Sequence, residues 1–222
     1  MQKFFTRPRS NHSEMVATKN FLTSPLVLLS SLSTTIASPP WPEYPATCPQ
    51  ISPNPIPLQQ VPSHFLPRAV IDVSATETIK RTLAIYALAV DGKDWAALDA
   101  VFAADAVANY SAPLGVLKGL SAIQSTLSAS LAQFPGGTQH SLGTQIVDVC
   151  AQDVAVSVTY YTATHYLGAA RDVTSIVNGS QVLYAHGQYQ DTWGKHENGG
   201  WKIAYRNLVY MVSKLKEDAG RK

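Results

Sequence analysis

The sequence predicts an α+β domain in which three helices pack on one face of a curved sheet. Apolar residues recur at helical spacing in the first half of the domain. Four long segments rich in β-branched and aromatic residues follow, with turn signals between them. Helices followed by a run of antiparallel strands are typical of α+β domains. We therefore expect a cone with a pocket between the helices and the concave face of the sheet.

The expected helices precede the strands. The first is expected to begin with the cap sequence Thr76-Glu77-Thr78-Ile79 and to end at Asp91-Gly92. A short second helix should follow, with apolar positions at Trp95, Leu98, Val101 and Phe102. The third should start at Gly119-Leu120-Ser121 and stop before Pro135-Gly136-Gly137. Their apolar residues, such as Ile79 and Leu83 in the first helix, would face the sheet.

The expected strands are one short segment and four long ones. Weak alternation over residues 106–112 predicts a short strand between the second and third helices. The long strands are expected over residues 139–150, 153–167, 180–194 and 200–212. Asn198-Gly199-Gly200 supplies a hairpin turn for the last pair.

The chain divides into four expected parts. These are a targeting segment over residues 1–37, a proline-rich linker over 38–69, the folded domain over 70–213 and a charged tail over 214–222. The targeting segment is apolar and small from residue 21 onwards, which is typical of a secretory signal. We therefore expect a secreted protein that is not stably inserted in a membrane once the signal is removed.

The N-terminal signal has its own alternatives. Lys19 precedes the apolar stretch, and cleavage is expected near Ala37 or Ser38. A start at Met15 would give a more ordinary signal than the longer sequence. An uncleaved membrane anchor or a disordered tail are the competing interpretations.

Prolines dominate the linker. Residues 39–68 hold 10 of the 14 prolines, a density that argues against helix and central strand and predicts an extended linker or a strap lying on the domain. Cys48 lies within it and could pair with Cys150 in an oxidising compartment, although Cys150 could equally be a small buried hydrophobe. Two glycosylation sequons, at Asn109 and Asn178, are compatible with secretion.

Composition excludes several classes of function. The chain is 14% charged with a net charge of +2 that comes largely from its two ends, and it has no basic stripe interleaved with aromatic residues. Nucleic acid is therefore not an expected partner. Histidines at metal-ligand spacing and a Gly-x-Ser-x-Gly elbow are both missing from the sequence, so we expect neither a metal nor a serine nucleophile.

Three residues suggest acid–base chemistry. Asp91 ends a helix, where the helix dipole disfavours an anion. A neighbouring histidine would stabilise its carboxylate. A carboxylate that holds a histidine gives a general base near neutral pH. His140 is the candidate partner, and His165 shares a strand face with Tyr161. The alternatives are a simple Asp-Gly turn for Asp91 and ordinary half-buried strand histidines.

The order of elements and several motifs resemble a known family. The stretches IKRTLAIYALAVDGKDWAALDAVFAADAVANY, TQHSLG, HGQYQDTW and GWKIAYR are similar to a SnoaL-like domain of the nuclear transport factor 2-like superfamily, over about residues 75–212. Within it, VDGKDW and TQH most resemble fungal scytalone dehydratase. The resemblance implies a cone-shaped α+β barrel of three N-terminal helices on a curved mixed, mainly antiparallel sheet. It also implies acid–base chemistry without a cofactor.

The resemblance also implies a site. The family's catalytic carboxylate falls on Asp91, its two histidines on His140 and His165, and a cavity tyrosine on Tyr110. Val90 stands where the family has tyrosine, and two small polar residues fall near Gly187 and Tyr189, so neither is kept. The substrate is therefore expected to differ from scytalone. The residues expected to line the substrate pocket are Tyr161, Tyr189, Val90 and Phe134.

Other polar residues receive structural interpretations. His186 should face away from the pocket, as a structural or interface residue. Tyr160, Tyr184 and Tyr205 are expected to pack on the sheet. Asp191 should close a turn or a hydrogen-bond network, with a second acid role as the alternative. Arg206 should pair with a buried acid or lie on the sheet surface.

Together these observations predict a dehydratase, isomerase or cyclase that acts on a hydrophobic, oxygenated small molecule. The expected substrate is a secondary metabolite. The Asp91–His140 pair would remove a proton next to a carbonyl, with Tyr110 and His165 assisting. This fold also hosts dehydrohalogenases and pure binding proteins. The alternatives are therefore a secreted protein that only binds an apolar ligand and a scaffold that forms homo-oligomers through the outer sheet face.

Overall fold

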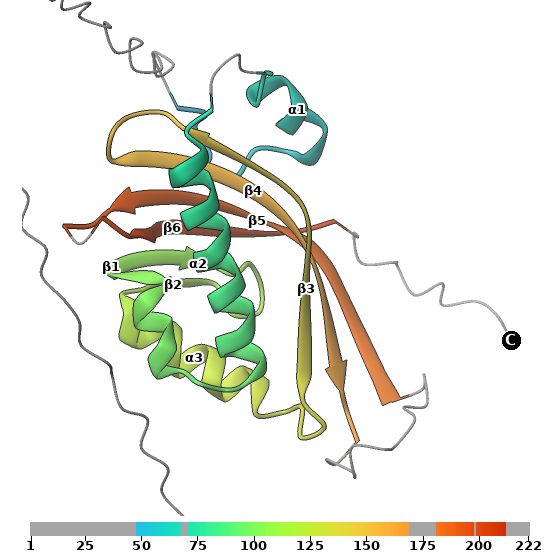
Figure 1. Cartoon of the computed structure of the whole chain (residues 1–222). Coiled ribbons are helices and arrows are strands. Elements are labelled where there is room, and N and C mark those ends of the chain that lie inside the picture. The colour runs from blue at the N-terminus through green and yellow to red at the C-terminus, as the bar shows by residue number, and fades with distance from the viewer. Residues whose placement is uncertain (1–47, 68–70, 169–180, 198, 212–222) are drawn as a thin grey trace, which may run out of the picture. The chain divides into compact units, whose positions relative to one another are not determined.

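A single six-strand sheet, with its three longest helical elements on one face, organises the domain (Figure 1). The computed structural model describes residues 48–67, 71–168, 181–197 and 199–211. The helical elements of the domain are α2 (Val73–Asp91), η2 (Ala96–Ala100) and α3 (Leu120–Leu131). The strands are β1 (Phe102–Asn109), β2 (Val116–Lys118), β3 (Thr138–Val149), β4 (Val154–Tyr166), β5 (Val182–Lys195) and β6 (Trp201–Tyr210). This confirms the predicted fold class.

The sheet is mixed and mainly antiparallel. Its order is β2-β1-β6-β5-β4-β3, and β1 and β6 form the one parallel pair among the described strands. The four long strands agree with the predicted segments to within a few residues. Register shifts at Leu142/Gln145 in β3 and at Thr192/Trp193 in β5 interrupt the ladders, and such irregularities bend strands.

The long helix α2 begins earlier than predicted. Its N-cap is Asp72, whose carboxylate accepts a hydrogen bond from the Ala75 amide at 2.9 Å, so the Thr76 cap prediction was wrong. Asp is among the best N-cap residues because its oxygen satisfies an otherwise unpaired amide of the first turn. The helix ends at Asp91, as predicted, where the Gly92 amide donates to the Leu88 carbonyl.

The second helix was predicted too long. Only residues 96–100 are helical, as the 3₁₀-helix η2, and Phe102 begins β1 instead of completing a helical face. The cause is tertiary, because Phe102 pairs in parallel with Ile203 of β6 across the sheet. The predicted strand over residues 106–112 is therefore β1 shifted towards the N-terminus, and the short strand β2 was missed.

The main core lies between the helices and the concave face of the sheet. Ile79, Leu83 and Ile123 from α2 and α3 are fully buried there, with Trp193 and Ile203 from the sheet. These helix positions follow the predicted apolar spacing. Several core residues, among them Tyr86, Tyr161 and Tyr189, also line a cavity between α2, α3 and strands β3 to β6.

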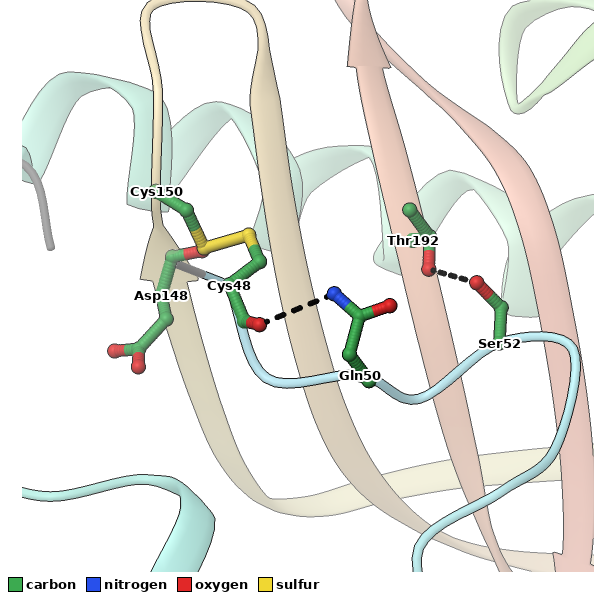
Figure 2. Close-up of a disulfide and its surroundings, with 6 residues drawn as sticks. All are labelled: Cys48, Gln50, Ser52, Asp148, Cys150 and Thr192. Atoms are coloured by element: carbon green, nitrogen blue, oxygen red, sulfur yellow. Dashed lines mark hydrogen bonds between the residues drawn. A yellow bond between two sulfur atoms is a disulfide. The ribbon is translucent and has the colours of Figure 1, made fainter. Parts of the chain in front are cut away.

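The residues from 48 to 67 form a strap on the outer face of the sheet. A disulfide joins Cys48 to Cys150, directly after β3, so the strap interpretation holds and Cys150 is not a free thiol (Figure 2). Contrary to the prediction, part of this segment is helical, in η1 (Leu58–Gln60) and α1 (Val61–His64). Pro62 is accommodated because it lies in the first turn of α1, where its missing amide has no partner to lose.

The strap buries a second, smaller core. Ile51, Ile56, Val61 and Phe65 pack with Cys150 and with two strand residues, Val156 and Val158. Polar contacts fix its path, because the Gln190 side chain bonds both the amide and the carbonyl of Ile56 at 2.8 Å, and Asn207 donates to the Ile51 carbonyl at 2.7 Å. The strap thus covers part of the outer sheet face. Oligomerisation through that face stays a prediction.

Several smaller predictions have different outcomes. Asn109 donates to Asn207 and accepts from the Ser111 amide within the sheet, so it is not a free glycosylation site. Tyr184 is 62% exposed, so it is not buried in the sheet, and its one ring contact among the described residues is with His186, at 6.4 Å. Tyr160 and Tyr205 are half-buried. His186 lies on the outer face, as predicted, against Thr162.

Four predictions lie wholly or partly outside the described residues. They concern the signal over residues 1–37, the tail over 214–222, the sequon at Asn178 and the turn at Asn198. The residues on either side of the turn do pair, because the His196 amide donates a hydrogen bond to the Gly200 carbonyl. Among the helices that the structure describes, none combines the length and apolar character needed to cross a membrane.

Candidate active site

A cavity of about 200 Å³ opens between α2, α3 and the concave face of β3 to β6. Its only titratable lining residues among those described are histidines and tyrosines; the remainder are chiefly aliphatic and aromatic. The lining residues are Tyr86, Val90, Tyr110, Pro113, Leu114, Leu127, Ser130, Leu131, Phe134, His140, Tyr161, Ala163, His165, Ala185, Tyr189, Leu208 and Tyr210. Such a lining favours an uncharged, largely apolar molecule with oxygen substituents.

Asp91 and His140 form the central polar pair of this cavity. The Asp91 carboxylate accepts three hydrogen bonds. They come from His140 Nδ1 at 2.6 Å, from the His140 backbone amide at 2.7 Å and from the Thr138 hydroxyl at 3.2 Å. A carboxylate is an acceptor only, so Nδ1 carries a proton, and Nε2 is the nitrogen that can act as a base in the neutral ring. Asp91 therefore bonds both the ring and the backbone of His140, whose side chain is 7% exposed and lines the cavity.

The local sequence explains this arrangement. Asp91 is the last residue of α2, where backbone carbonyls point outward and an anion needs donors. Thr138 and His140 sit two residues apart at the start of β3, so their side chains point to the same face. The donors that Asp91 lacks at the helix end are therefore supplied by the neighbouring strand.

His165 faces His140 across the cavity. The two rings are 6.1 Å apart, and the His165 ring stacks on Phe134 at 4.4 Å. Burial, and then the nearby His140, lower the pKa of His165 below its ordinary value. Its Nδ1 is buried without a hydrogen-bond partner among the described residues. At neutral pH His165 is therefore an uncharged ring suited to hydrogen bonding.

Two tyrosines form a hydroxyl pair deeper in the cavity. The hydroxyl groups of Tyr110 and Tyr86 lie 3.3 Å apart, in a buried hydrogen bond. Burial, reinforced by Tyr86, raises the pKa of Tyr110 well above its usual value. Tyr110 consequently stays protonated over the physiological range, as a hydroxyl that can donate to an oxygen atom of a ligand.

Tyr161 and Tyr189 form one wall. Their rings stack at 4.4 Å, and burial raises the pKa of both hydroxyls. Gly187 makes this possible, because a Cβ at that position would lie 2.7 Å from the Tyr161 ring and 2.6 Å from the Val209 carbonyl. The glycine that replaces a small polar residue of the resembled enzyme thus makes room for an aromatic ring.

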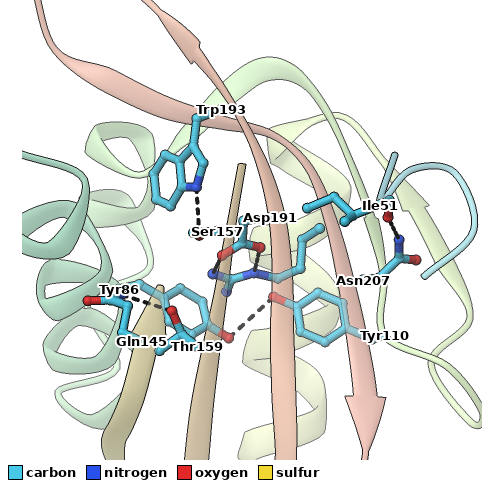
Figure 3. A network of polar contacts seen from close by, with 10 residues as sticks. Ile51, Tyr86, Tyr110, Gln145, Ser157, Thr159, Asp191, Trp193 and Asn207 are labelled. Carbon is cyan, nitrogen blue, oxygen red and sulfur yellow. Dashed lines mark hydrogen bonds and ion pairs between the residues drawn. The ribbon is translucent and has the colours of Figure 1, made fainter. Parts of the chain in front are cut away.

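A buried ion pair contacts the rings of Tyr86 and Tyr189. Arg206 donates to both oxygens of Asp191, at 2.7 and 2.8 Å, and both side chains are fully buried (Figure 3). Its guanidinium carbon lies 4.2 Å from the Tyr86 ring centre and 4.1 Å from that of Tyr189. The prediction that Arg206 pairs with a buried acid is confirmed. Asp191 lies within β5, not in a turn, and closes a hydrogen-bond network with Arg206 of β6.

The structure brings the predicted site residues together. Val90, Tyr110, Phe134, His140, Tyr161, His165 and Tyr189 all line the cavity, and Asp91 bonds to His140 from behind. Tyr86 and Tyr210 were missed as lining residues. Tyr86 lies one helical turn before Val90, and this spacing could have placed it in the pocket, but the same spacing also fits a core residue. Among the described residues no cluster of three or more potential metal ligands occurs.

Comparisons with known proteins agree with the fold. No curated protein matches the chain. Solved structures match at low identity and at the level of fold. The Kfla4162 protein from Kribbella flavida is 20% identical, with a TM-score of 0.54 over 63% of this chain and 92% of that one. A candidate scytalone dehydratase from Novosphingobium aromaticivorans is 23% identical, with a TM-score of 0.51 over 68% and 97% of the respective chains.

A third structure and a family model name the fold. A nuclear transport factor 2-like superfamily protein from Salmonella enterica is 18% identical, with a TM-score of 0.50 over 66% of this chain and all of that one. The model of a SnoaL-like domain matches residues 72–207, which is more than half of the chain. The chain therefore belongs to the SnoaL-like domain family, and its helices and six-strand mixed sheet have the nuclear transport factor 2-like fold.

Proposed function

We propose that this protein is a cofactor-independent acid–base enzyme that acts on an uncharged, hydrophobic and oxygenated small molecule. The observation that carries the proposal is the Asp91–His140 pair at 2.6 Å beside an otherwise apolar and aromatic cavity. A polar pair of this kind adds little to a hydrophobic core, but it is the arrangement that activates an imidazole as a base.

In the proposed reaction, His140 Nε2 removes a proton from a carbon next to a carbonyl group. The electron pair of the C–H bond forms an enolate, and Asp91 stabilises the imidazolium that results. Tyr110 donates a hydrogen bond to the enolate oxygen, where negative charge develops. Loss of a β-hydroxyl group, migration of the double bond or ring closure can each follow from that enolate.

His165 has a different role from His140. Its lowered pKa makes it uncharged at neutral pH, so it is a hydrogen-bond donor rather than a strong acid. From 6.1 Å across the cavity it can hold a hydroxyl group of the substrate, or steady a leaving hydroxyl, on the side opposite the base. Phe134, Val90, Tyr161 and Tyr189 would hold the carbon skeleton.

The motifs VDGKDW and TQH favour a dehydratase of the scytalone dehydratase type among these options. The cavity wall nevertheless differs, because Val90, Gly187 and Tyr189 replace the polar groups of that enzyme. We therefore propose a related secondary metabolite rather than scytalone as the substrate. The Cys48–Cys150 disulfide supports secretion, since disulfides persist in oxidising compartments.

The experiment measures proton abstraction directly. Metabolite extracts are incubated with the protein in D₂O and followed by mass spectrometry for new products and for deuterium uptake next to a carbonyl. Wild type should give both. His140→Ala should lose about 10²–10⁴-fold in rate, the usual contribution of a general base. His186→Ala removes a histidine from the outer face and serves as the matched control.

Two results would contradict the proposal. Full turnover by folded His140→Ala would exclude the mechanism. A compound that co-purifies with the cavity and is never converted or deuterated by wild type would instead identify a secreted binding protein, the alternative function that this fold allows.

A further inference from the structure

Tyr86 has no assigned role in the proposed reaction, yet its contacts are unusual for a core residue. Its side chain is 2% exposed, and its hydroxyl meets that of Tyr110 at 3.3 Å inside the cavity lining. A phenylalanine would fill the same apolar space. The hydroxyl is therefore the part of Tyr86 that packing alone does not explain.

A buried cation lies against the Tyr86 ring. The Arg206 guanidinium carbon lies 4.2 Å from the Tyr86 ring centre and 4.1 Å from that of Tyr189, and the two ring planes are 81° apart. Asp191 holds the guanidinium in a bidentate pair (Figure 3). A cation over an aromatic face draws electron density from the ring, which makes the hydroxyl of that ring a better hydrogen-bond donor. The contact also limits the movement of the Tyr86 ring and hence of its hydroxyl.

We infer that Tyr86 is a positioning residue that directs the Tyr110 hydroxyl at a ligand oxygen, with Arg206 holding Tyr86 in place. Either hydroxyl of this pair could be the donor. In the inferred arrangement Tyr86 donates to the Tyr110 oxygen, which leaves the Tyr110 proton free to donate into the cavity. Successive hydrogen bonds of this kind strengthen one another. The ligand group that this subsite takes is a carbonyl or phenolic oxygen that gains negative charge. The role of Tyr86 in catalysis rests on the proposed function, whereas its role in positioning the Tyr110 hydroxyl does not.

A binding assay tests it without turnover. The probe is 4-nitrophenol, whose neutral form and phenolate have different absorption bands, so both affinity and ionised fraction of the bound probe can be read. Tyr86→Phe keeps the ring over the guanidinium and removes only the hydroxyl. It should weaken binding of the phenolate about fivefold, the loss expected for one hydrogen bond, and lower the ionised fraction. Tyr110→Phe should lower both at least as much.

Tyr205→Phe is the matched control, because Tyr205 precedes Arg206 on β6 and points to the opposite face of the sheet. It should bind the probe as wild type does. Arg206→Lys should weaken phenolate binding at least as much as Tyr86→Phe, since an ammonium cannot stack on both rings and Arg206 also interacts with the Tyr110 hydroxyl; circular dichroism checks its fold. If that variant does not fold, Tyr86→Phe alone decides.

An unchanged affinity and ionised fraction in folded Tyr86→Phe would overturn the inference. So would weaker binding of the neutral probe with an unchanged ionised fraction, because that result is what a merely structural tyrosine gives. If both His140→Ala and Asp91→Asn kept full turnover, the proposed function would be overturned instead. The binding assay would still test the inference about Tyr86.

Discussion

The side chain of Asp91, at the end of α2, holds Nδ1 of His140, at the start of β3, at 2.6 Å. The two residues are 49 positions apart in the sequence. The contact joins the long helix to an edge strand of the described sheet and aims the second ring nitrogen at the cavity. A structural ion pair would not require that geometry, and its chemical consequence can be tested separately from its contribution to folding.

Asp91→Asn should reduce the proposed turnover while leaving the protein folded. The amide keeps the size of the carboxylate but loses its charge, so the imidazolium formed in the reaction is no longer stabilised. We expect a fall of at least about 10²-fold in rate, measured on whichever reaction the extracts reveal. Asp94→Asn, on an exposed residue three positions along, is the control. Equal activity in Asp91→Asn and wild type would show that the pair is structural.

His165 should give the free energy of unfolding a pH dependence on the acid side of neutrality. Its pKa is lowered in the folded state by burial, so the unfolded chain binds the proton more readily. Stability from this group is therefore complete above the unfolded value of about 6.5 and falls as the pH drops from there through the folded pKa. Urea unfolding at a series of pH values measures it. His165→Phe should flatten that part of the profile, and an unchanged slope would refute the assignment.

Asp191→Ala should destabilise the protein strongly. The change leaves the Arg206 guanidinium buried and unpaired, for which a loss of about 3–5 kcal/mol in the free energy of unfolding is expected. Asp99→Ala breaks an exposed pair with Lys202, at 3.6 Å, and should cost at most about 1 kcal/mol. Chemical denaturation compares the two. A similar small loss in both variants would mean that Arg206 finds another partner.

Gly187→Ala should disturb the cavity wall as well as stability. The added methyl group would meet the Tyr161 ring and the Val209 carbonyl at distances that require a shift. Overpacking of this kind costs about 1–3 kcal/mol. On the same strand, a Cβ at Gly194 meets nothing within 4 Å, so Gly194→Ala should be nearly neutral. Thermal denaturation and 4-nitrophenol binding measure both effects; equal behaviour of the two variants would contradict the close contact.

Removing the disulfide should loosen the strap without dismantling the cavity. Cys48 and Cys150 are 102 positions apart, and cross-links that close long loops stabilise by about 2–4 kcal/mol. The Cys48→Ser/Cys150→Ser double variant should unfold at lower denaturant concentration and become cleavable by protease between residues 48 and 67. Probe binding should persist, because the strap lies on the outer face. Loss of binding at full folding would link the strap to the site.

The sequence by itself determined the class of fold and named the residues that meet at the cavity. Apolar spacing in α2 and α3 and alternation in β3 to β6 are local properties, since each element must bury one face, and they survive in the structure. Asp91, His140 and His165 were suggested by their residue chemistry and by the resemblance, and Tyr110 by the resemblance alone. Both routes depend on the side chains of single elements and need no knowledge of how distant elements pair.

Only the tertiary structure decided the features that depend on pairing. Phe102 belongs to a strand because β6 offers it a parallel partner, and the prolines of the strap tolerate short helices because the outer sheet face buries Val61 and Phe65. The helical spacing of Tyr86 is the same for packing and for function, so spacing alone could not reveal its place in the cavity. Its second role depends on Tyr110 and Arg206, which lie 24 and 120 positions away and reach it only when the sheet closes over the helix.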